Sequence, residues 1–197
     1  MKISYRLVLL VLFCGIWVGC NNKQKAVSSD RQDFNELQKE LLASGWYCVI
    51  PENGDLSEDY GVVPTKGLQD NYFDITIGEG CNVVLKIVNK ATECCVRYVF
   101  VQENSTTTVS QIPQGEYYLK LSYGYDWMEY SNDGILKGKF TRNVVYEISQ
   151  DVFDFGKKNS LQVINYSLKI NVENSTLMNN FRTKEIGEAE FFNEIHS

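Results

Sequence analysis

The sequence predicts a mostly β protein: an antiparallel β-sandwich with a short amphipathic helix before it and a short helical turn near its end. Three observations lead to this class. Short runs rich in Val, Ile, Tyr and Phe recur along the chain, turn-forming residues separate them, and only two segments space their apolar residues as a helix does. Many short strands with few helices are typical of two packed sheets.

The first 19 residues are interpreted as an export signal. Lys2 and Arg6 form a basic start, Leu7 to Gly19 is an apolar run, and Cys20 follows it. The run is shorter than the roughly 20 apolar residues that a membrane helix needs. The segment resembles a bacterial lipoprotein signal, which implies cleavage after residue 19 and attachment of acyl chains such as palmitate at Cys20. The alternative is an unprocessed or secreted form.

Three further segments follow the signal. Residues 20–29 are polar and predict a lipidated tether. Residues 30–45 predict an amphipathic helix, because Phe34, Leu37, Leu41 and Leu42 fall at helical spacing before the stop at Ser44-Gly45. Residues 46–197 predict the β-sandwich domain. The helix is expected to pack its apolar side against the edge of this domain, and binding to a partner is the alternative.

Strands are expected where branched and aromatic residues alternate or run together between turn residues. In chain order the expected strands are 46–50, a short one at 62–63, 72–77, 82–89, 94–102, 106–110, 116–123, 139–148, 152–155 and 161–172. A short turn between 82–89 and 94–102 predicts a hairpin. Residues 187–192 are expected to form one or two helical turns.

One stretch has the pattern of a known group of sandwiches. Residues 106–120, TTTVSQIPQGEYYLK, place a turn and Gly115 before Tyr117 at the start of a strand. This pattern resembles transthyretin-like and carboxypeptidase-regulatory-like domains. Together with RYVFV before it and YGYDW, GKFTRN and FDFG after it, the stretch is similar to bacterial envelope lipoproteins that carry one such domain. The resemblance covers residues 80–192, and it implies a fold without implying an activity.

The charge of the chain excludes one class of partner. The net charge is −6, and removing residues 1–19 takes away two basic residues and no acid, which leaves −8. An acidic protein of this kind is not expected to bind nucleic acid, whose recognition depends on cationic contacts to phosphate. Acyl chains alone would then hold it to the membrane. Asn21 to Lys25 contains no acid, which favours the periplasm-facing side of the bacterial envelope.

Catalysis is not expected. The single histidine, His196, lies next to the C-terminus, where it is poorly placed to act as a base. The acid pairs Asp126 with Glu129 and Asp151 with Asp154 are interpreted as solvated loop charges. The chain has no phosphate-binding glycine loop and no His/Cys cluster for a transition metal, so neither a cofactor nor a metal is expected.

The cysteines that follow Cys20 leave two alternatives open. Cys48, Cys81, Cys94 and Cys95 are even in number and can pair outside the cytoplasm. Cys94 and Cys95 are adjacent in a strand, so they point to opposite faces and are not expected to share one partner. Buried free thiols are the second alternative.

An aromatic segment is the candidate ligand site. In a regular strand Tyr123, Tyr125 and Trp127 share one face, where they can form a platform for a glycan or a peptide. Filling of the core is the alternative for these rings. Arg142 is expected to pair with an acid on a neighbouring strand.

The expected function is that of a non-catalytic, membrane-anchored lipoprotein. Its sandwich is expected to bind or position another envelope protein. The alternative is a carbohydrate- or peptide-binding lipoprotein that uses the rings around Trp127.

Overall fold

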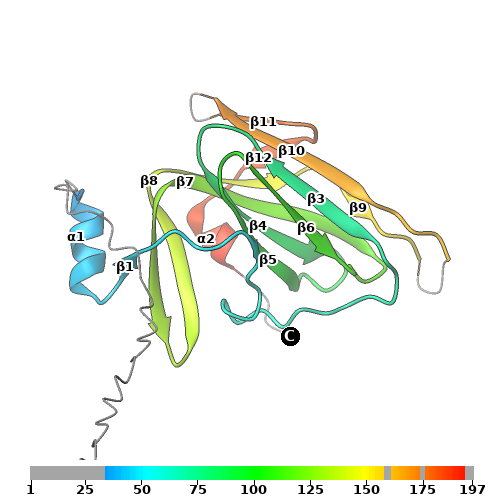
Figure 1. Cartoon of the computed structure of the whole chain (residues 1–197), viewed down its shortest axis with the longest axis horizontal. Coiled ribbons are helices and arrows are strands. Elements are labelled where there is room, and N and C mark those ends of the chain that lie inside the picture. Colours follow the sequence, from blue (N-terminus) through cyan, green and yellow to red (C-terminus); the bar gives the residue numbers. More distant parts are fainter. Residues whose placement is uncertain (1–33, 158–160, 174–175, 194–197) are drawn as a thin grey trace, which may run out of the picture. The chain divides into compact units, whose positions relative to one another are not determined.

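The computed structural model describes residues 34–157, 161–173 and 176–193. Its strands form two sheets, with two short helices outside them (Figure 1). The prediction of a mostly β protein with two sheets and few helices is confirmed. The signal, Cys20, the tether and the histidine near the C-terminus lie outside the described residues. The compact unit begins at Phe34 and contains its own hydrophobic core.

The larger sheet has the strand order β12-β8-β7-β4-β5-β2, and β1 and β9 also pair with β7. Its strands are β1 (Tyr47–Cys48), β2 (Gly54–Asp55), β4 (Asn82–Asn89), β5 (Cys95–Val101), β7 (Glu116–Asn132), β8 (Ile135–Ser149), β9 (Phe153–Asp154) and β12 (Thr183–Glu185). The smaller sheet, in the order β11-β10-β3-β6, contains β3 (Tyr72–Ile77), β6 (Ser105–Ser110), β10 (Tyr166–Glu173) and β11 (Thr176–Asn179). The helices are α1 (Glu36–Ala43) and α2 (Glu188–Phe192).

The strand pattern departs from the prediction in several places, among them one pairing and one expected strand. Among the described residues every pairing is antiparallel except that of β10 with β3, which is parallel. The chain reaches β10 from β9 in the other sheet, so no hairpin sets the direction of β10. Residues 62–63 form no strand, although Val62 is buried against the larger sheet.

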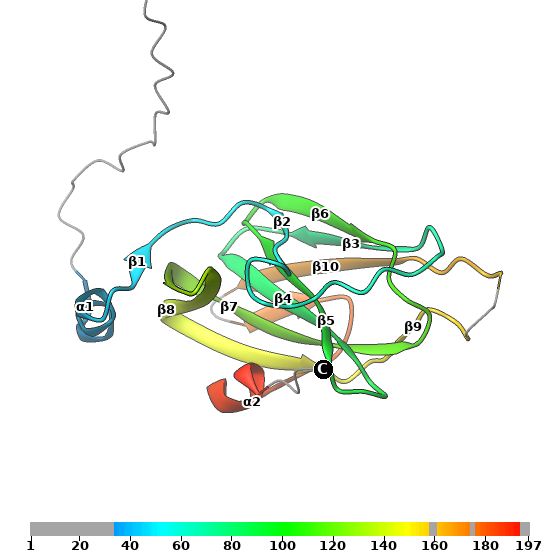
Figure 2. The same cartoon turned by 90° about the horizontal axis from the view of Figure 1, so that it is seen from below.

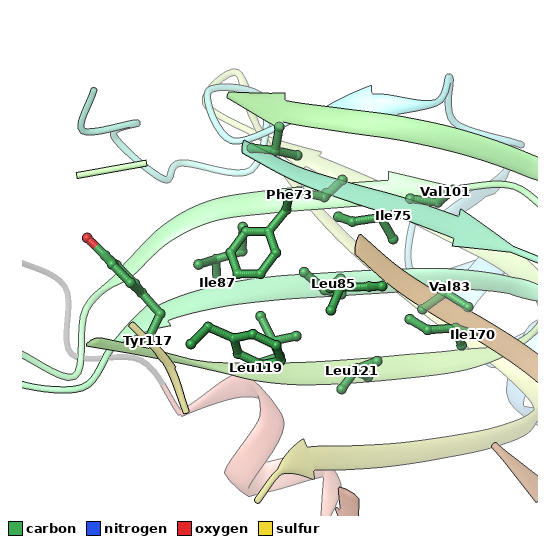
Figure 3. Packing of buried hydrophobic residues seen from close by; sticks show 14 of the residues in the cluster. Phe73, Ile75, Val83, Leu85, Ile87, Val101, Tyr117, Leu119, Leu121 and Ile170 are labelled. Carbon is green, nitrogen blue, oxygen red and sulfur yellow. The ribbon is translucent and has the colours of Figure 1, made fainter. Parts of the chain in front are cut away.

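The main core lies between the two sheets. Alternate residues of β3 and β10 face alternate residues of β4, β5 and β7, as the labelled side chains in Figure 3 show. Tyr117 is fully buried at one end of this core, and its hydroxyl donates to the carbonyl oxygen of Pro113 at 2.8 Å. Gly115, at φ +146°, provides the turn between them. The bond joins the start of β7 to the preceding turn, as a tyrosine corner does.

A second cluster covers the opposite face of the larger sheet. Its members come from β4, β5, β7, β8, the loop before β3 and the C-terminal segment: Val62, Val84, Tyr98, Phe100, Trp127, Phe140, Ile186 and Phe191. Figure 2 shows α2 on this outer face, on the side away from β3, β6 and β10. The larger sheet is therefore buried on both faces over much of its area, which explains the continuous apolar run of β4.

The hairpin of β7 and β8 extends beyond the two-sheet part, with α1 and β1 beside it (Figures 1 and 2). Asp133 and Gly134 connect its strands, and both have positive φ, 52° and 83°. This two-residue turn matches the right-handed twist of the strands. The strand predicted for 116–123 is therefore the first half of a strand that runs to Asn132.

Candidate functional site

The predicted aromatic platform does not form, because the hairpin bends within the segment that carries it. The β7–β8 register shifts between Tyr123 and Tyr125, and Asp126 has φ +56°. Gly124 allows the bend, since a Cβ there would lie 3.0 Å from the carbonyl oxygen of Arg142. The bulge interrupts the alternation of faces that a regular strand has.

The three rings consequently lie in three different places. Tyr123 belongs to the core between the sheets, and Trp127 belongs to the cluster on the outer face. Tyr125 is 38% exposed, and the Arg142 guanidinium lies 4.7 Å from the centre of its ring. Burial, together with Glu147, raises the pKa of Tyr123. The prediction that Tyr123, Tyr125 and Trp127 share one surface is therefore wrong. Tyr125 is exposed, and the other two rings are buried in the two hydrophobic clusters.

A buried carboxylate holds the bent hairpin to its neighbours. Glu129 accepts hydrogen bonds from Trp127 Nε1 at 2.9 Å, the Tyr60 hydroxyl at 2.5 Å and the Tyr47 hydroxyl at 3.3 Å. Burial raises the pKa of Tyr60, and the hydrogen bond to Glu129 raises it further. The prediction that Glu129 is a solvated loop charge is wrong, because it is 5% exposed and joins β1, the loop before β3 and the hairpin.

Polar side chains hold α1 against the hairpin. Asn35 caps the helix and donates from Nδ2 to the Thr141 carbonyl oxygen at 3.1 Å. Gln38, the buried residue of the helix, donates to Asp126 at 3.1 Å and to the Thr141 hydroxyl at 2.9 Å. Arg142 pairs with Asp126 across the hairpin, as predicted, at 2.7 Å. Its hydrogen bond lowers the pKa of Asp126.

The apolar side of α1 is only partly covered. Phe34 and Leu41 are half-buried beside Gln38, whereas Leu37 and Leu42 are 40% and 37% exposed. Tyr47 in the following strand is 42% exposed. The expectation that the apolar side packs on the domain is wrong for the two exposed leucines, since the hairpin offers α1 a polar surface. Leu37 and Leu42 are five positions apart and therefore lie about 140° apart around the helix. We call the exposed residues Leu37, Leu42 and Tyr47 together the α1 surface.

A cleft of about 710 Å³ lies on the outer face, beside the hairpin. We call it the hairpin cleft. Six segments line it: the residue before β1, the loop before β3, the neighbouring strands β4 and β5, the start of β8, and α2. Its lining residues are Trp46, Tyr60, Gly61, Lys86, Tyr98, Ile135, Leu136, Lys137, Gly138, Lys139, Glu188 and Phe192.

Two lysines on the outer face bind the C-terminal end of α2. Lys86 and Lys120 are opposite each other on β4 and β7, and both are almost fully buried. Lys86 donates to the Phe191 carbonyl oxygen at 3.3 Å, and Lys120 donates to that of Glu190 at 2.7 Å. Carbonyl groups at a helix end attract cations. Sequence reasoning missed this pair, although a lysine inside the apolar run VVLKIV was a usable signal.

The four described cysteines are free thiols in this structure. Cys81 is buried in the main core, and burial raises the pKa of its thiol to about 11. Cys48 is exposed, and Cys94 and Cys95 are half-buried. Of the two alternatives, the structure contains free thiols, but only Cys81 is fully buried.

Within the described ranges, no group of three or more His, Cys, Asp or Glu side chains is arranged to hold a metal ion. No helix in that part of the chain is both long and apolar enough to cross a membrane. Asp151, predicted as a solvated acid, pairs at the surface with Arg182 at 2.6 Å.

A scan of protein-family models, a search of curated proteins and a search of solved structures each found no match to this chain.

Proposed function

We propose that this protein is a non-catalytic lipoprotein of the bacterial envelope, anchored through Cys20, whose β-sandwich binds or positions another envelope protein. The signal-like residues 1–19 and the cysteine after them support the anchor. Two acyl chains suffice for stable attachment, so the acidic domain needs no further attraction to lipid.

The observation that carries the protein-binding role is the α1 surface. Leu37, Leu42 and Tyr47 are exposed in a short stretch of chain just after the tether, while the helix is held in place through Asn35 and Gln38. Exposed apolar side chains on a helix that polar contacts hold in place are available to a partner protein.

The cleft supports a binding role over a catalytic one. In the part of the chain that the structure describes, its lining contains aromatic rings, aliphatic side chains, lysines and one glutamate, and no serine, cysteine or histidine. A nucleophilic mechanism needs such a group beside a base. We also propose that the sandwich is of the transthyretin-like type, supported by the Tyr117–Pro113 hydrogen bond at the Gly115 turn.

The alternative of glycan or peptide binding around Trp127 loses its main support. Trp127 is 4% exposed and Tyr123 is 2% exposed, so neither presents a ring face to a ligand. Tyr125 alone is exposed, and the Arg142 guanidinium already lies against its ring.

Site-specific photo-cross-linking in cells tests the protein-binding role. A benzophenone amino acid replaces Leu37 in the α1 surface or, as a control, Leu68, which is fully exposed in the loop before β3. We expect one protein adduct of defined mass from position 37 and none from position 68. Equal adducts from both positions, lipid adducts only, or no adduct at position 37 would exclude the α1 surface as a protein-binding site.

Palmitate labelling tests the anchor separately. The wild-type chain should incorporate the label and sediment with membranes, whereas Cys20→Ala should do neither. Cys48→Ala serves as the matched control and should behave as wild type, since Cys48 lies in the domain. Incorporation into Cys20→Ala would place the acyl chain elsewhere.

A further inference from the structure

The hairpin cleft has the form of a small-molecule site. Its volume of about 710 Å³ lies in the range of pockets that hold drug-sized ligands. Rings from separate elements provide its apolar walls: Trp46 before β1, Tyr60 from the loop, Tyr98 on β5 and Phe192 on α2. Such surfaces favour a flat, apolar ligand body.

The charges of the cleft are the opposite of those of the whole protein. Among the described residues, its lining contains three lysines, Lys86, Lys137 and Lys139, and one acid, Glu188, in a chain whose net charge is −6. Glu188 pairs with Lys139 at 2.9 Å and Lys86 binds the end of α2, so within the described lining Lys137 provides the cationic excess. An apolar cavity with excess positive charge favours an organic anion over a neutral or cationic ligand.

The cleft is also firmly built. Lys86 lies 4.5 Å from the ring centre of Phe191 and 5.2 Å from that of Phe192, which fixes α2 over β4. Tyr60 stacks on Tyr98 with ring centres 4.3 Å apart, and its hydroxyl is held by Glu129. A preformed site avoids the free-energy cost of ordering its walls on binding.

We propose that the hairpin cleft binds a small organic anion with a flat, apolar body, and that Lys137 and Lys139 attract its charged group. This site is separate from the α1 surface, so it does not depend on the protein-binding role. Glu188 would oppose the ligand twice, by its own charge and by its pairing with Lys139.

Two dyes that differ only by one charged group provide the test. 1-Anilinonaphthalene-8-sulfonate is an anion, and N-phenyl-1-naphthylamine has the same rings without the sulfonate. Binding is measured by titration on the chain from Asn21 onward, which contains the whole compact unit and needs no detergent. We expect saturable 1:1 binding of the anion that weakens with salt, and binding of the neutral dye at least about tenfold weaker.

Substitutions then locate the site. Lys137→Gln with Lys139→Gln should weaken binding of the anion about tenfold, whereas Lys66→Gln with Lys169→Gln, which removes the same charge elsewhere, should leave it unchanged. Glu188→Gln should strengthen binding at an unchanged 1:1 stoichiometry and with an unchanged circular dichroism spectrum, because partial unfolding also increases binding of this dye. Circular dichroism monitors the fold of each variant.

Three results would overturn the proposal: no saturable binding of the anion, equal binding of the two dyes, or equal effects of the two lysine pairs. An unchanged or weaker affinity in Glu188→Gln would also contradict it. Each of these outcomes leaves the cross-linking result at Leu37 unaffected.

Discussion

Replacing Gly138 with alanine tests how tightly the bent hairpin is packed. A Cβ at this position would lie 2.2 Å from Trp127 Cζ2, 2.8 Å from Trp127 Cε2 and 3.0 Å from Tyr60 Cε1. Carbon atoms pack at about 3.5–4.0 Å. The indole would therefore have to move by more than about 1 Å in a region where Trp127 is 4% exposed.

The surroundings of the indole set the size of the effect. Its ring centre lies 4.7 Å from that of Phe140 and 5.3 Å from that of Phe100, so the ring has no free space to enter. Overpacking of a core costs about 1–3 kcal/mol. Displacing Nε1 from Glu129 removes a hydrogen bond to a buried carboxylate, which adds about 1.5–3 kcal/mol if the bond is lost. We expect a total loss of about 3 kcal/mol in the free energy of unfolding.

Urea unfolding followed by tryptophan fluorescence measures this loss. Gly187→Ala is the matched control, because a Cβ there meets no atom within 4 Å. Gly187 is the N-cap of α2, where Gly is preferred over Ala, so the control should lose about 1 kcal/mol at most. Trp127→Phe in the Gly138→Ala background relieves the contact, so the double variant should be more stable than the sum of the two single losses predicts. A Gly138→Ala protein within about 0.5 kcal/mol of wild type would refute the packing of this hairpin as described.

Three further predictions concern charged and titratable groups. The hydrogen bond from Arg142 lowers the pKa of Asp126 below its ordinary 3.8, so the ionised carboxylate stabilises the fold above about pH 4 and this contribution is lost as the pH falls. Asp126→Asn should therefore make the urea midpoint depend less on pH on the acid side, and an unchanged pH profile would contradict this. Burial raises the pKa of Cys81 to about 11 from 9.0, so the fold loses this contribution to its stability only as the pH rises above about 9. Alkylation at pH 8, mapped by mass spectrometry, should be at least about tenfold slower at Cys81 than at exposed Cys48, and equal rates would disprove this. Arg97 is 1% exposed and donates hydrogen bonds to three main-chain carbonyls. Arg97→Met leaves these carbonyls unpaired, so the free energy of unfolding should fall by at least about 3 kcal/mol in thermal or urea unfolding, and a loss below about 1 kcal/mol would contradict a stabilising role for these hydrogen bonds.

Local pattern predicted the regular strands well. The expected bounds 72–77 and 82–89 coincide with β3 and β4. In β3 the alternation of Phe73, Ile75 and Ile77 with polar residues reflects burial on one face, and in β4 the apolar run reflects burial on both. The turn at Asp133-Gly134 was readable as well, since this dipeptide is a strong hairpin signal, but the prediction ended the preceding strand at 123.

The candidate ligand site was not predictable in the same way. Tyr123 and Trp127 have the spacing of one strand face, and only the bulge at Gly124 and the positive φ of Asp126 send them to opposite sides of the larger sheet. The hairpin cleft combines Trp46, Lys86, Lys139 and Phe192, which lie far apart along the chain. No local pattern connects such residues, because their proximity follows from how the sheet folds and where α2 packs.

The sequence by itself determined the β class, the positions of the main strands, the acidic charge, and the signal-like start that ends at Cys20. These properties depend on composition and on neighbours within a few residues. Only the tertiary structure decided the parallel pairing of β10 with β3, the face that each aromatic ring occupies, and the three hydrogen-bond donors to the buried carboxylate Glu129. The physical reason is that pairing and burial are set by contacts between distant segments, whose free energies outweigh the local preferences that a sequence displays.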